Sequence, residues 1–431
     1  MNLTLLPYLY KLHQIRKNQR RDYLQIKRIQ EKKLKLLLCH AYCNVEYYRK
    51  LFQQKNILPQ DIKCLEDLVK IPLTDRESIQ ALPKEEITAR GINLKRCGNL
   101  RTSGSSGVPL NIFVSRREAV WWSLSRRTLY FESGGRLHDR ELIIVAPESF
   151  PLGQRQWLGS LNILKTKSIS IFTDTEYKLK AMLDFNPTII TSYVSILKDL
   201  ASEIKKRGIK NIKPKIIFST AELMTEKDRE LIRAAFQSSV FNYYSCNECG
   251  IISWECQKHN GLHLNIDNVI VEVIKEDGTQ ANYGENGEIV VTGLNNYTMP
   301  FIRYRLKDTG MLLKEQCSCG RGSSLIKIAA GRTNDYIRLP AGNRISPYFL
   351  TCEIENIPGV ARYQIVQEKI DSLKIRIIKD ADFSQQTITR ITNSLRRLLG
   401  RDIGINIALE EVILPDVKTG KFRIIGSLLD V

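Results

Sequence analysis

Short apolar runs alternate with longer amphipathic segments between residues 140 and 250. The runs ELIIVAP, PTIITSY and PKIIFST are apolar, and helical segments such as VSILKDLASEIKKRG separate them. Short buried strands that alternate with helices are typical of a parallel sheet covered by helices. The pattern therefore predicts an α/β fold for this part of the chain.

The regions on either side have different patterns. Residues 1–55 predict helices, with a broad apolar stripe formed by Leu36, Leu37, Leu38, Ala41 and Val45. Beyond residue 260 the segments NVIVEVIKEDG and GEIVVTGL predict strands, and EDGTQANYGENGE supplies turn residues between them.

A smaller unit is predicted from about residue 332 onward. SLKIRIIKD and INIALEEV predict strands. Between them lies a predicted helix that begins after Ser384 as N-cap, ends at Gly400, and carries Ile388, Ile391, Leu395 and Leu398 on one face. We therefore expect two domains, residues 1–331 and 332–431.

Composition and length support a globular protein with more than one core. The chain has 431 residues, of which 43% are hydrophobic and 26% charged, a balance typical of folded rather than disordered chains. No apolar run approaches the roughly 18 residues of a membrane-spanning helix. The first residues, MNLTLLPYLYKLHQIRK, lack the order of a signal peptide, so we expect a cytoplasmic protein.

The formal net charge is +19, and much of the excess is near the N-terminus. The basic residues there are Lys11, Arg16, Lys17, Arg20, Arg21, Lys27, Arg28, Lys32, Lys33 and Lys35. Such a field attracts nucleic acid, acidic lipid headgroups or nucleotide phosphates, or it forms a solvated helix face. Aromatic residues do not interleave with these charges in a base-stacking pattern. We expect no specific nucleic-acid partner and consider a peripheral membrane contact through these helices.

The segment RTSGSSGVPL, residues 101–110, combines hydroxyl side chains with glycines. Glycines allow several backbone N–H groups to converge on one anion, and hydroxyls add donors. A strand-then-helix pattern, NIFVSRREAVWWSLSRR, follows directly. The segment lacks the Gly-Lys-Ser/Thr ending of a Walker loop. By itself it is consistent with an anion-binding loop or with an ordinary Ser/Gly turn.

The segment TSGSSGVP is similar to the phosphate loop of the adenylate-forming (AMP-binding) superfamily. Five more segments resemble that family's motifs in the same order: STAEL with Glu222, YYSCNE from Tyr243 to Glu248, RYRLKD from Arg303 to Asp308, GRTND from Gly331 to Asp335, and KTGKFR near the C-terminus. MPFIRYRLKD, CSCGR and GRTNDYIRLPAGNRISP resemble the phenylacetate–CoA ligase and CapK-like branch.

The resemblance implies a large multi-sheet N-terminal domain and a small mobile α+β C-terminal domain. It also implies an enzyme that uses ATP to convert a carboxylic acid into an acyl-adenylate. The nucleotide-binding residues implied are Thr102, Ser103, Gly104, Ser105, Ser106, Gly107, Glu222, Tyr243, Tyr244, Asp308 and Arg332. Glu248 would ligate Mg²⁺, Asp308 would accept hydrogen bonds from the ribose, and Lys421 would stabilise charge during adenylation.

The chain departs from the family pattern at three positions. Ser245 stands where a glycine is usual, and Asn247 stands where a small hydroxyl residue is usual. Asn334 occupies the hinge position, where Asp or Lys is more common. An asparagine can donate a hydrogen bond to phosphate and tolerates unusual backbone angles, so these departures do not exclude catalysis.

Cys256, His263, Cys317 and Cys319 resemble a zinc site found in parts of the same branch. Two thiolate-bearing segments and an imidazole suit tetrahedral Zn²⁺ in a structural role. His259, Cys246 and Cys249 are rival ligands, since Cys246-x-x-Cys249 also has metal spacing. The alternative is that the cysteines are small core residues in a reducing cytosol.

The partners implied are a small carboxylic acid and CoA or another acyl acceptor. The cofactors implied are ATP/AMP, Mg²⁺, CoA and structural Zn²⁺. The CapK-like resemblance suggests a role in capsular or O-antigen polysaccharide biosynthesis. The alternative functions are a catalytically degenerate relative that binds nucleotide or zinc, and a basic accessory protein at a membrane or nucleic acid.

Overall fold

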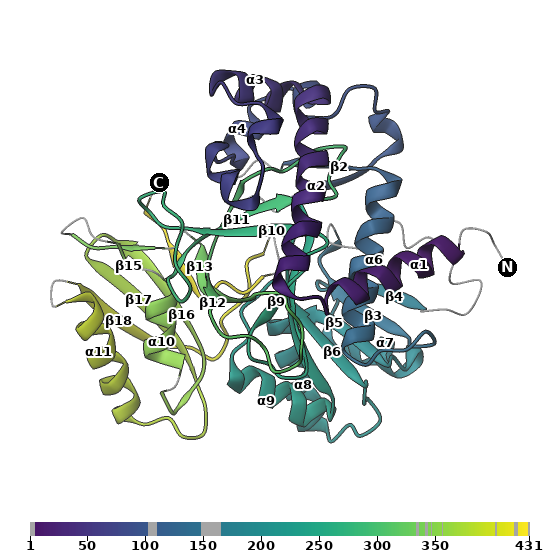
Figure 1. Ribbon diagram of the computed structural model, residues 1–431. Helices are drawn as coiled ribbons and strands as arrows, with labels where there is room; N and C mark the ends of the chain where they lie inside the picture. The colour runs from purple at the N-terminus through teal and green to yellow at the C-terminus, as the bar shows by residue number, and fades with distance from the viewer. Residues whose placement is uncertain are drawn as a thin grey trace.

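The computed structural model describes residues 5–101, 110–147, 165–332, 336–340, 344–345, 347–355, 357–400, 403–417 and 421–429. Within these residues, the strands form one eleven-stranded sheet, one four-stranded sheet and two small two-stranded sheets. Figure 1 shows the four-stranded sheet at one side of the molecule, the first helix at the opposite side, and the helices of residues 23–80 at the top. None of the described helices combines the length and the apolar character needed to cross a membrane.

Helices dominate the first 55 residues, as predicted, and shorter helices follow up to residue 96. The elements are α1 (Leu5–Asn18), α2 (Tyr23–Asn44), α3 (Glu46–Gln54), α4 (Arg76–Gln80) and α5 (Lys84–Ile87), with short 3-10 turns at Pro59–Asp61, Leu65–Lys70 and Leu94–Arg96. Leu37, Leu38, Ala41 and Val45 of the predicted stripe are buried, but Leu36 is 58% exposed. Leu36 was wrongly included, because it lies about 100° around the helix from Leu37 and faces solvent.

Several of the basic residues near the N-terminus form ion pairs within the protein. Arg16 and Arg20 pair with Glu132, Lys27 pairs with Glu66, and Lys33 pairs with Asp267. Lys33 also lies over the Trp121 ring, 4.6 Å from its centroid. Part of the positive charge therefore fixes the first helices to the rest of the fold.

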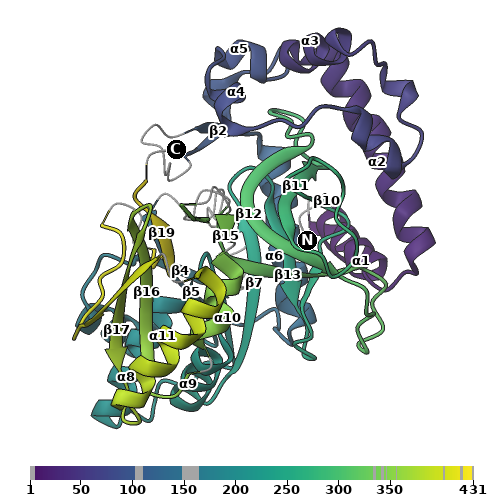
Figure 2. The same ribbon diagram turned by 90° about the vertical axis from the view of Figure 1, so that its left-hand side faces the viewer.

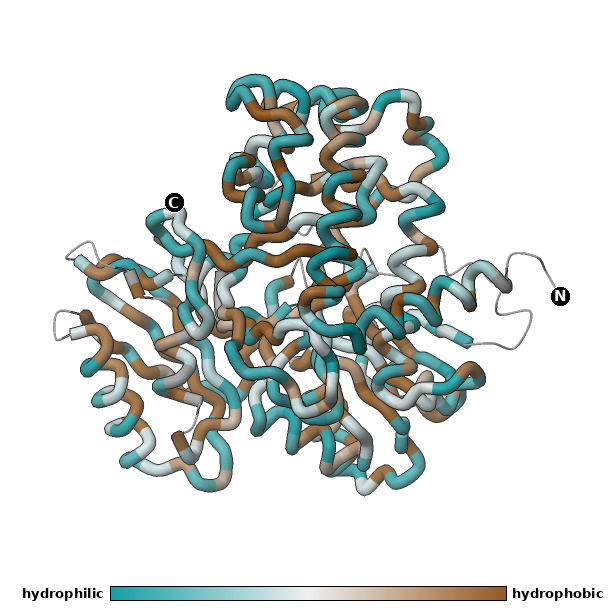
Figure 3. Tube along the Cα trace, viewed as in Figure 1, coloured by the Kyte–Doolittle hydropathy of each residue, from teal (hydrophilic) through white to brown (hydrophobic). Residues whose placement is uncertain are grey.

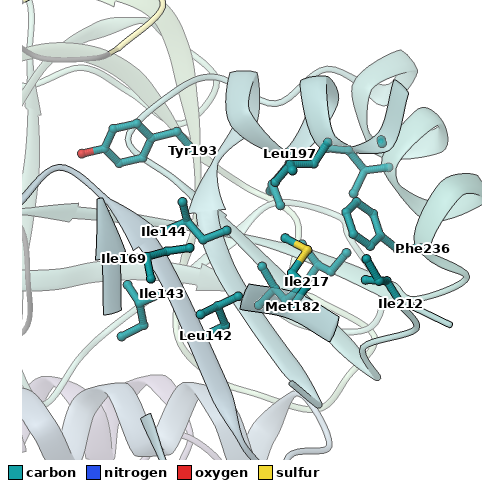
Figure 4. Close-up of a cluster of buried hydrophobic side chains, with 14 of the residues drawn as sticks. Leu142, Ile143, Ile144, Ile169, Met182, Tyr193, Leu197, Ile212, Ile217 and Phe236 are labelled. Atoms are coloured by element: carbon teal, nitrogen blue, oxygen red, sulfur yellow. The ribbon is translucent and has the colours of Figure 1, made fainter. Parts of the chain in front are cut away.

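Parallel strands form one half of the large sheet, which confirms the predicted α/β region. The strands are β3 (Glu141–Val145), β4 (Thr166–Ser170), β5 (Ile189–Tyr193), β6 (Ile216–Thr220) and β7 (Ser239–Cys246), in the order β4-β3-β5-β6-β7. The helices are α7 (Thr175–Phe185), α8 (Val194–Arg207) and α9 (Glu226–Phe236). Figure 4 shows side chains of the strands, such as Leu142 and Ile217, packed against Leu197 and Phe236 of the helices.

Antiparallel strands form the other half. They are β8 (Gly250–Glu255), β9 (Leu262–Leu264), β10 (Val269–Ile274), β11 (Gly287–Gly293), β12 (Tyr304–Leu313) and β13 (Leu325–Arg332), in the order β7-β8-β9-β13-β12-β11-β10. In Figure 3 several strands are hydrophobic along their length, whereas helices alternate between hydrophobic and hydrophilic residues. Strand β7 pairs parallel with β6 and antiparallel with β8, so its carboxyl end lies where the two halves meet.

The C-terminal residues form a separate sheet with its own core. The elements are β14 (Ile337–Arg338), β15 (Arg344–Ile345), α10 (Pro347–Glu355), β16 (Val360–Lys369), β17 (Ser372–Lys379), α11 (Gln385–Leu399), β18 (Gly404–Leu409) and β19 (Ile425–Ser427), with sheet order β18-β17-β16-β19. Ser384 is the N-cap of α11 and Gly400 its C-cap, as predicted, and Ile391 and Leu395 are buried. Figure 2 shows this sheet in front of α8 and α9.

Candidate functional site

The predicted phosphate loop, Thr102 to Gly107, lies outside the described residues. The strands on either side of it, β1 (Gly98–Arg101) and β2 (Asn111–Val114), pair antiparallel with Arg101 opposite Asn111. Ser115 then caps helix α6 (Arg116–Glu132) by accepting a hydrogen bond from the Glu118 N–H. The strand-then-helix pattern expected after the loop is confirmed.

Tyr244 and Asp308 form the most direct contact among the predicted nucleotide-side residues. The Tyr244 hydroxyl donates a hydrogen bond of 2.6 Å to Oδ2 of Asp308. Tyr244 lies near the end of β7, Asp308 lies in β12, and strand register places Asp308 opposite Arg332 in β13. Residues 64 positions apart in sequence are thus brought together beside the carboxyl end of β7, and ligands of open α/β sheets commonly bind outside the carboxyl ends of the strands.

Glu248 is the second residue after the end of β7 and is buried. The Tyr304 hydroxyl donates a hydrogen bond of 3.1 Å to Glu248 Oε1, and burial together with this carboxylate raises the pKa of Tyr304. Tyr304 begins β12, the same strand that carries Asp308. Because Glu248 contributes a carboxylate beside the end of β7, its chemistry suits an oxygen-seeking ion such as Mg²⁺.

Tyr243 lies on the opposite face of β7 from Tyr244. Its ring contacts Phe218 edge-on, with centroids 6.3 Å apart, within a buried cluster that includes Trp254. Burial raises the pKa of its hydroxyl. Since consecutive residues of a strand point to opposite faces, the structure does not bring Tyr243 together with Tyr244 and Asp308.

Glu222 contacts the C-terminal part of the chain. Its Oε2 accepts a hydrogen bond of 2.6 Å from the Ser195 N–H, and its Oε1 accepts bonds of 2.9 Å from Ser195 Oγ and 2.6 Å from the Phe422 N–H. Phe422 immediately follows the predicted catalytic Lys421, which is partly buried. The sequence carried no signal for this contact, because its partners lie 200 residues apart.

Four candidate metal ligands gather beside the large sheet. The ligand atoms of Cys256, His263, Cys317 and Cys319 all lie within 4.8 Å of one another. Cys256 Sγ is 3.6 Å from Cys317 Sγ, and Cys319 Sγ is 3.3 Å from His263 Nε2. His263 Nδ1 lies 3.0 Å from Ser323 Oγ, a partner that would orient the imidazole so that Nε2 faces the sulfurs.

The chemistry of this cluster fits zinc. Burial and the nearby Arg321 lower the pKa of His263 to about 4, so its imidazole is neutral at physiological pH, as a metal ligand requires. Three cysteines and one histidine are a common ligand set for structural Zn²⁺. Among the described residues, the rival His259 lies instead beside Glu255 and Arg229, and Cys246 accepts the Cys249 N–H.

The chain resembles known proteins in two ways: its C-terminal part matches a domain family, and most of the chain aligns with characterised relatives. Residues 337–427 match the CapK C-terminal domain family. The phenylacetate–coenzyme A ligase of Thermus thermophilus is 25% identical over 423 residues, covering 91% of this chain and 93% of the ligase. Protein CapK of Staphylococcus aureus is 22% identical over 396 residues, covering 88% of this chain and 84% of CapK. The chain is therefore similar over most of its length to phenylacetate–coenzyme A ligases and to CapK.

Solved structures of a CoA ligase show the same fold. The structure of 2-hydroxyisobutyryl-CoA ligase in the postadenylation state, with R3-HIB-AMP, has a TM-score of 0.78 at 17% identity and covers 96% of this chain and 91% of that chain. The same ligase in the thioesterification state, with 2-HIB-AMP and CoA, has a TM-score of 0.63 at 18% identity and covers 96% and 92%. The predicted resemblance and the predicted fold class are confirmed.

The relatives also confirm the expected type of enzyme, an AMP-forming acid–CoA ligase or a related adenylate-forming ligase. The roles of the individual site residues and the domain boundary at residues 331/332 stay predictions. The hinge position Asn334 lies outside the described residues, as do Lys418 and Gly420 on the N-terminal side of Lys421.

Proposed function

We propose that this adenylate-forming protein joins a small carboxylic acid to CoA in two steps. In the first step the acid's carboxylate attacks the α-phosphate of ATP, giving an acyl-adenylate and pyrophosphate. In the second step the CoA thiol attacks the acyl carbon, and AMP leaves. The named CoA ligases among the relatives support CoA as the acceptor.

The observation that carries this proposal is the grouping of Tyr244, Asp308 and Glu248 at the end of β7 and along β12. Asp308 would accept hydrogen bonds from the ribose hydroxyls, and Tyr244 holds that carboxylate in place. Glu248 would ligate the Mg²⁺ that arrives with ATP. Carboxylate oxygens accept hydrogen bonds and ligate metal ions, which suits hydroxyl and metal partners.

The first step brings two anions together, so it needs positive charge and backbone donors around the phosphates. The Thr102–Gly107 loop would hold the β- and γ-phosphates. Lys421 would neutralise charge that develops at the α-phosphate. The TM-score is higher against the postadenylation state (0.78) than against the thioesterification state (0.63), which supports an arrangement of the C-terminal part like that of the postadenylation state.

A screen of carboxylic acids for ATP-dependent pyrophosphate release tests the proposal. Phenylacetate is the first acid, because relatives are named phenylacetate–CoA ligases. Each acid is assayed with ATP and Mg²⁺ in three arms: without an acceptor, with CoA, and with hydroxylamine to trap the adenylate. We expect AMP and pyrophosphate in equal amounts and a CoA thioester in the second arm, with Glu248→Gln inactive.

Two outcomes of the screen would favour the alternative functions. ATP binding without pyrophosphate release from any acid would favour a degenerate relative. Salt-sensitive DNA binding with no turnover would favour an accessory protein on nucleic acid. If hydroxylamine traps an adenylate but no CoA thioester forms, the protein is still an adenylate-forming ligase, and its acyl acceptor is a compound other than CoA.

We also propose that Cys256, His263, Cys317 and Cys319 hold a structural Zn²⁺. Four protein ligands complete a tetrahedral sphere and leave no position for substrate. The ion would join the β8–β9 region to the segment between β12 and β13. A role in polysaccharide biosynthesis and a cytoplasmic location stay expectations of the sequence.

A further inference from the structure

Glu222 lies where the large sheet meets the C-terminal part. It comes two residues after the end of β6, and both of its oxygens accept hydrogen bonds. Two of the bonds come from Ser195 in the first turn of α8. The third comes from the backbone N–H of Phe422, the residue after Lys421. One carboxylate therefore joins the large-sheet part to the segment that carries the predicted catalytic lysine.

The backbone before Glu222 is unusual. Ala221 has φ of +67°, in the left-handed region that favours glycine and that alanine rarely adopts. Residues held in such conformations are found preferentially at functional sites and need support from their surroundings. Here the turn at Ala221 directs the next side chain toward Ser195 and Phe422.

Because Glu222 is buried, its charged form depends on the hydrogen bonds from Ser195 and Phe422. Burial raises the pKa of Glu222, and the hydrogen bonds from Phe422 and Ser195 oppose that effect. When a buried carboxylate loses a hydrogen-bond donor, a water molecule has to supply the replacement hydrogen bond. Departure of the Phe422 segment and hydration of Glu222 are therefore coupled.

Other contacts between the two parts surround this bond. Arg362 of β16 pairs at 3.1 Å with the exposed Asp199 of α8, and within the C-terminal part it lies over the Phe422 ring, 5.1 Å from its centroid. Lys227 of α9 donates a hydrogen bond of 3.3 Å to the Val360 carbonyl. Glu222, Arg362 and Phe422 also line one pocket. Glu222 is the member of this set that bonds directly to the backbone beside Lys421.

We propose that Glu222 is a positioning residue for Lys421, docking the backbone of the next residue so that the lysine is held for adenylation. The bond to Phe422 has to break before the C-terminal part can leave this arrangement. This inference rests on the proposed function of Lys421. It gives Glu222 a role different from the adenine-side contact expected from the sequence, because both oxygens already have partners within the chain.

The test compares Glu222→Ala and Glu222→Gln with the wild-type full chain and with Glu230→Gln. Glu230 is the matched control: it is an exposed carboxylate on α9 that pairs with Arg233 at 2.7 Å. Hydrogen exchange of the peptide that contains Phe422 measures docking without any substrate. In Glu222→Ala we expect exchange to be about 10- to 100-fold faster, as for loss of a hydrogen bond to a charged group, with Glu230→Gln unchanged.

Activity is then measured separately for the two half-reactions. Adenylation uses the acid selected by the pyrophosphate screen, and thioester formation uses the chemically synthesised acyl-adenylate of that acid with CoA. For Glu222→Ala we expect the kcat of adenylation to fall about 10- to 100-fold with the KM for ATP unchanged, and thioester formation to stay within about twofold. A purely structural role would lower both half-reactions together.

The outcomes separate this inference from the proposed function. Unchanged exchange at Phe422, or an equal loss in both half-reactions, overturns the positioning role. Glu222→Gln supplies the same comparison if the alanine variant does not fold, because it keeps the side chain's size while replacing one of the two acceptor oxygens by an NH₂ donor and removing the negative charge. A wild-type chain that activates no acid defeats the proposed function, and with it the role of Lys421, even if exchange shows that Glu222 docks Phe422.

Discussion

Replacing Glu132 with glutamine should destabilise the fold, because it removes a negative charge that forms ion pairs with three arginines. Glu132 ends α6, and its side chain is 1% exposed. Its carboxylate pairs with Arg16 at 2.8 Å, with Arg20 at 3.1 Å, and with Arg321. Arg321 follows Cys319 of the proposed zinc site by two residues, so the cluster connects the first helix to that site.

The expected magnitude follows from the exposure of the three arginines. Arg321 is 5% exposed, and leaving a buried charge without its partner typically costs about 3–5 kcal/mol. Arg16 and Arg20 are 43% and 58% exposed, so each adds no more than about 1 kcal/mol. The unfolding entropy is about 2.1 cal/mol/K per residue, and the cooperative unit is about 330 residues. The loss of about 3–5 kcal/mol at Arg321 therefore lowers Tm by about 4–7 °C.

Calorimetry of Glu132→Gln, with Glu66→Gln as control, measures this effect. Glu66 pairs with Lys27 but is 62% exposed, so its loss should change stability by less than about 1 kcal/mol. Arg16 and Arg321 lower the pKa of Glu132 in opposition to burial. Its contribution is therefore present above the unfolded-state pKa of about 4.3 and is lost as pH falls through the lower folded-state pKa. Equal Tm values for the two variants at pH 7 would refute the reasoning.

Three further variants test the site. Lys421→Ala should lose adenylate formation by about 10²- to 10³-fold while still binding ATP, and unchanged pyrophosphate release would contradict the role of the lysine. Tyr244→Phe removes the hydroxyl that holds Asp308 and should weaken ATP binding in calorimetric titration by about tenfold, whereas unaltered affinity would show that the hydroxyl is dispensable. Cys319→Ser should lower the bound zinc from about one ion per chain and reduce Tm. Cys39→Ser, at an exposed cysteine, should leave both the zinc content and Tm unchanged. Zinc-free wild-type protein would count against the site.

The sequence by itself determined the elements and the order of the motifs. Apolar runs predicted β3, β5 and β6 as parallel strands, and Ser384 and Gly400 marked the ends of α11. These signals are local, because a strand or a helix cap depends on residues within a few positions of one another. The motif residues also indicated the family that the chain resembles, and that resemblance pointed to Cys256, His263, Cys317 and Cys319 as metal candidates, which the fold brings together.

Tertiary structure decided which of these residues meet. Periodicity alone did not separate Leu36 from its buried neighbours. Adjacent tyrosines of one motif, Tyr243 and Tyr244, diverge because β7 turns one ring into the core and the other toward Asp308. The bond between Glu222 and the Phe422 backbone joins elements 200 residues apart. Such contacts depend on the strand order of the large sheet and on where the C-terminal sheet docks, and both are long-range properties that no local pattern encodes.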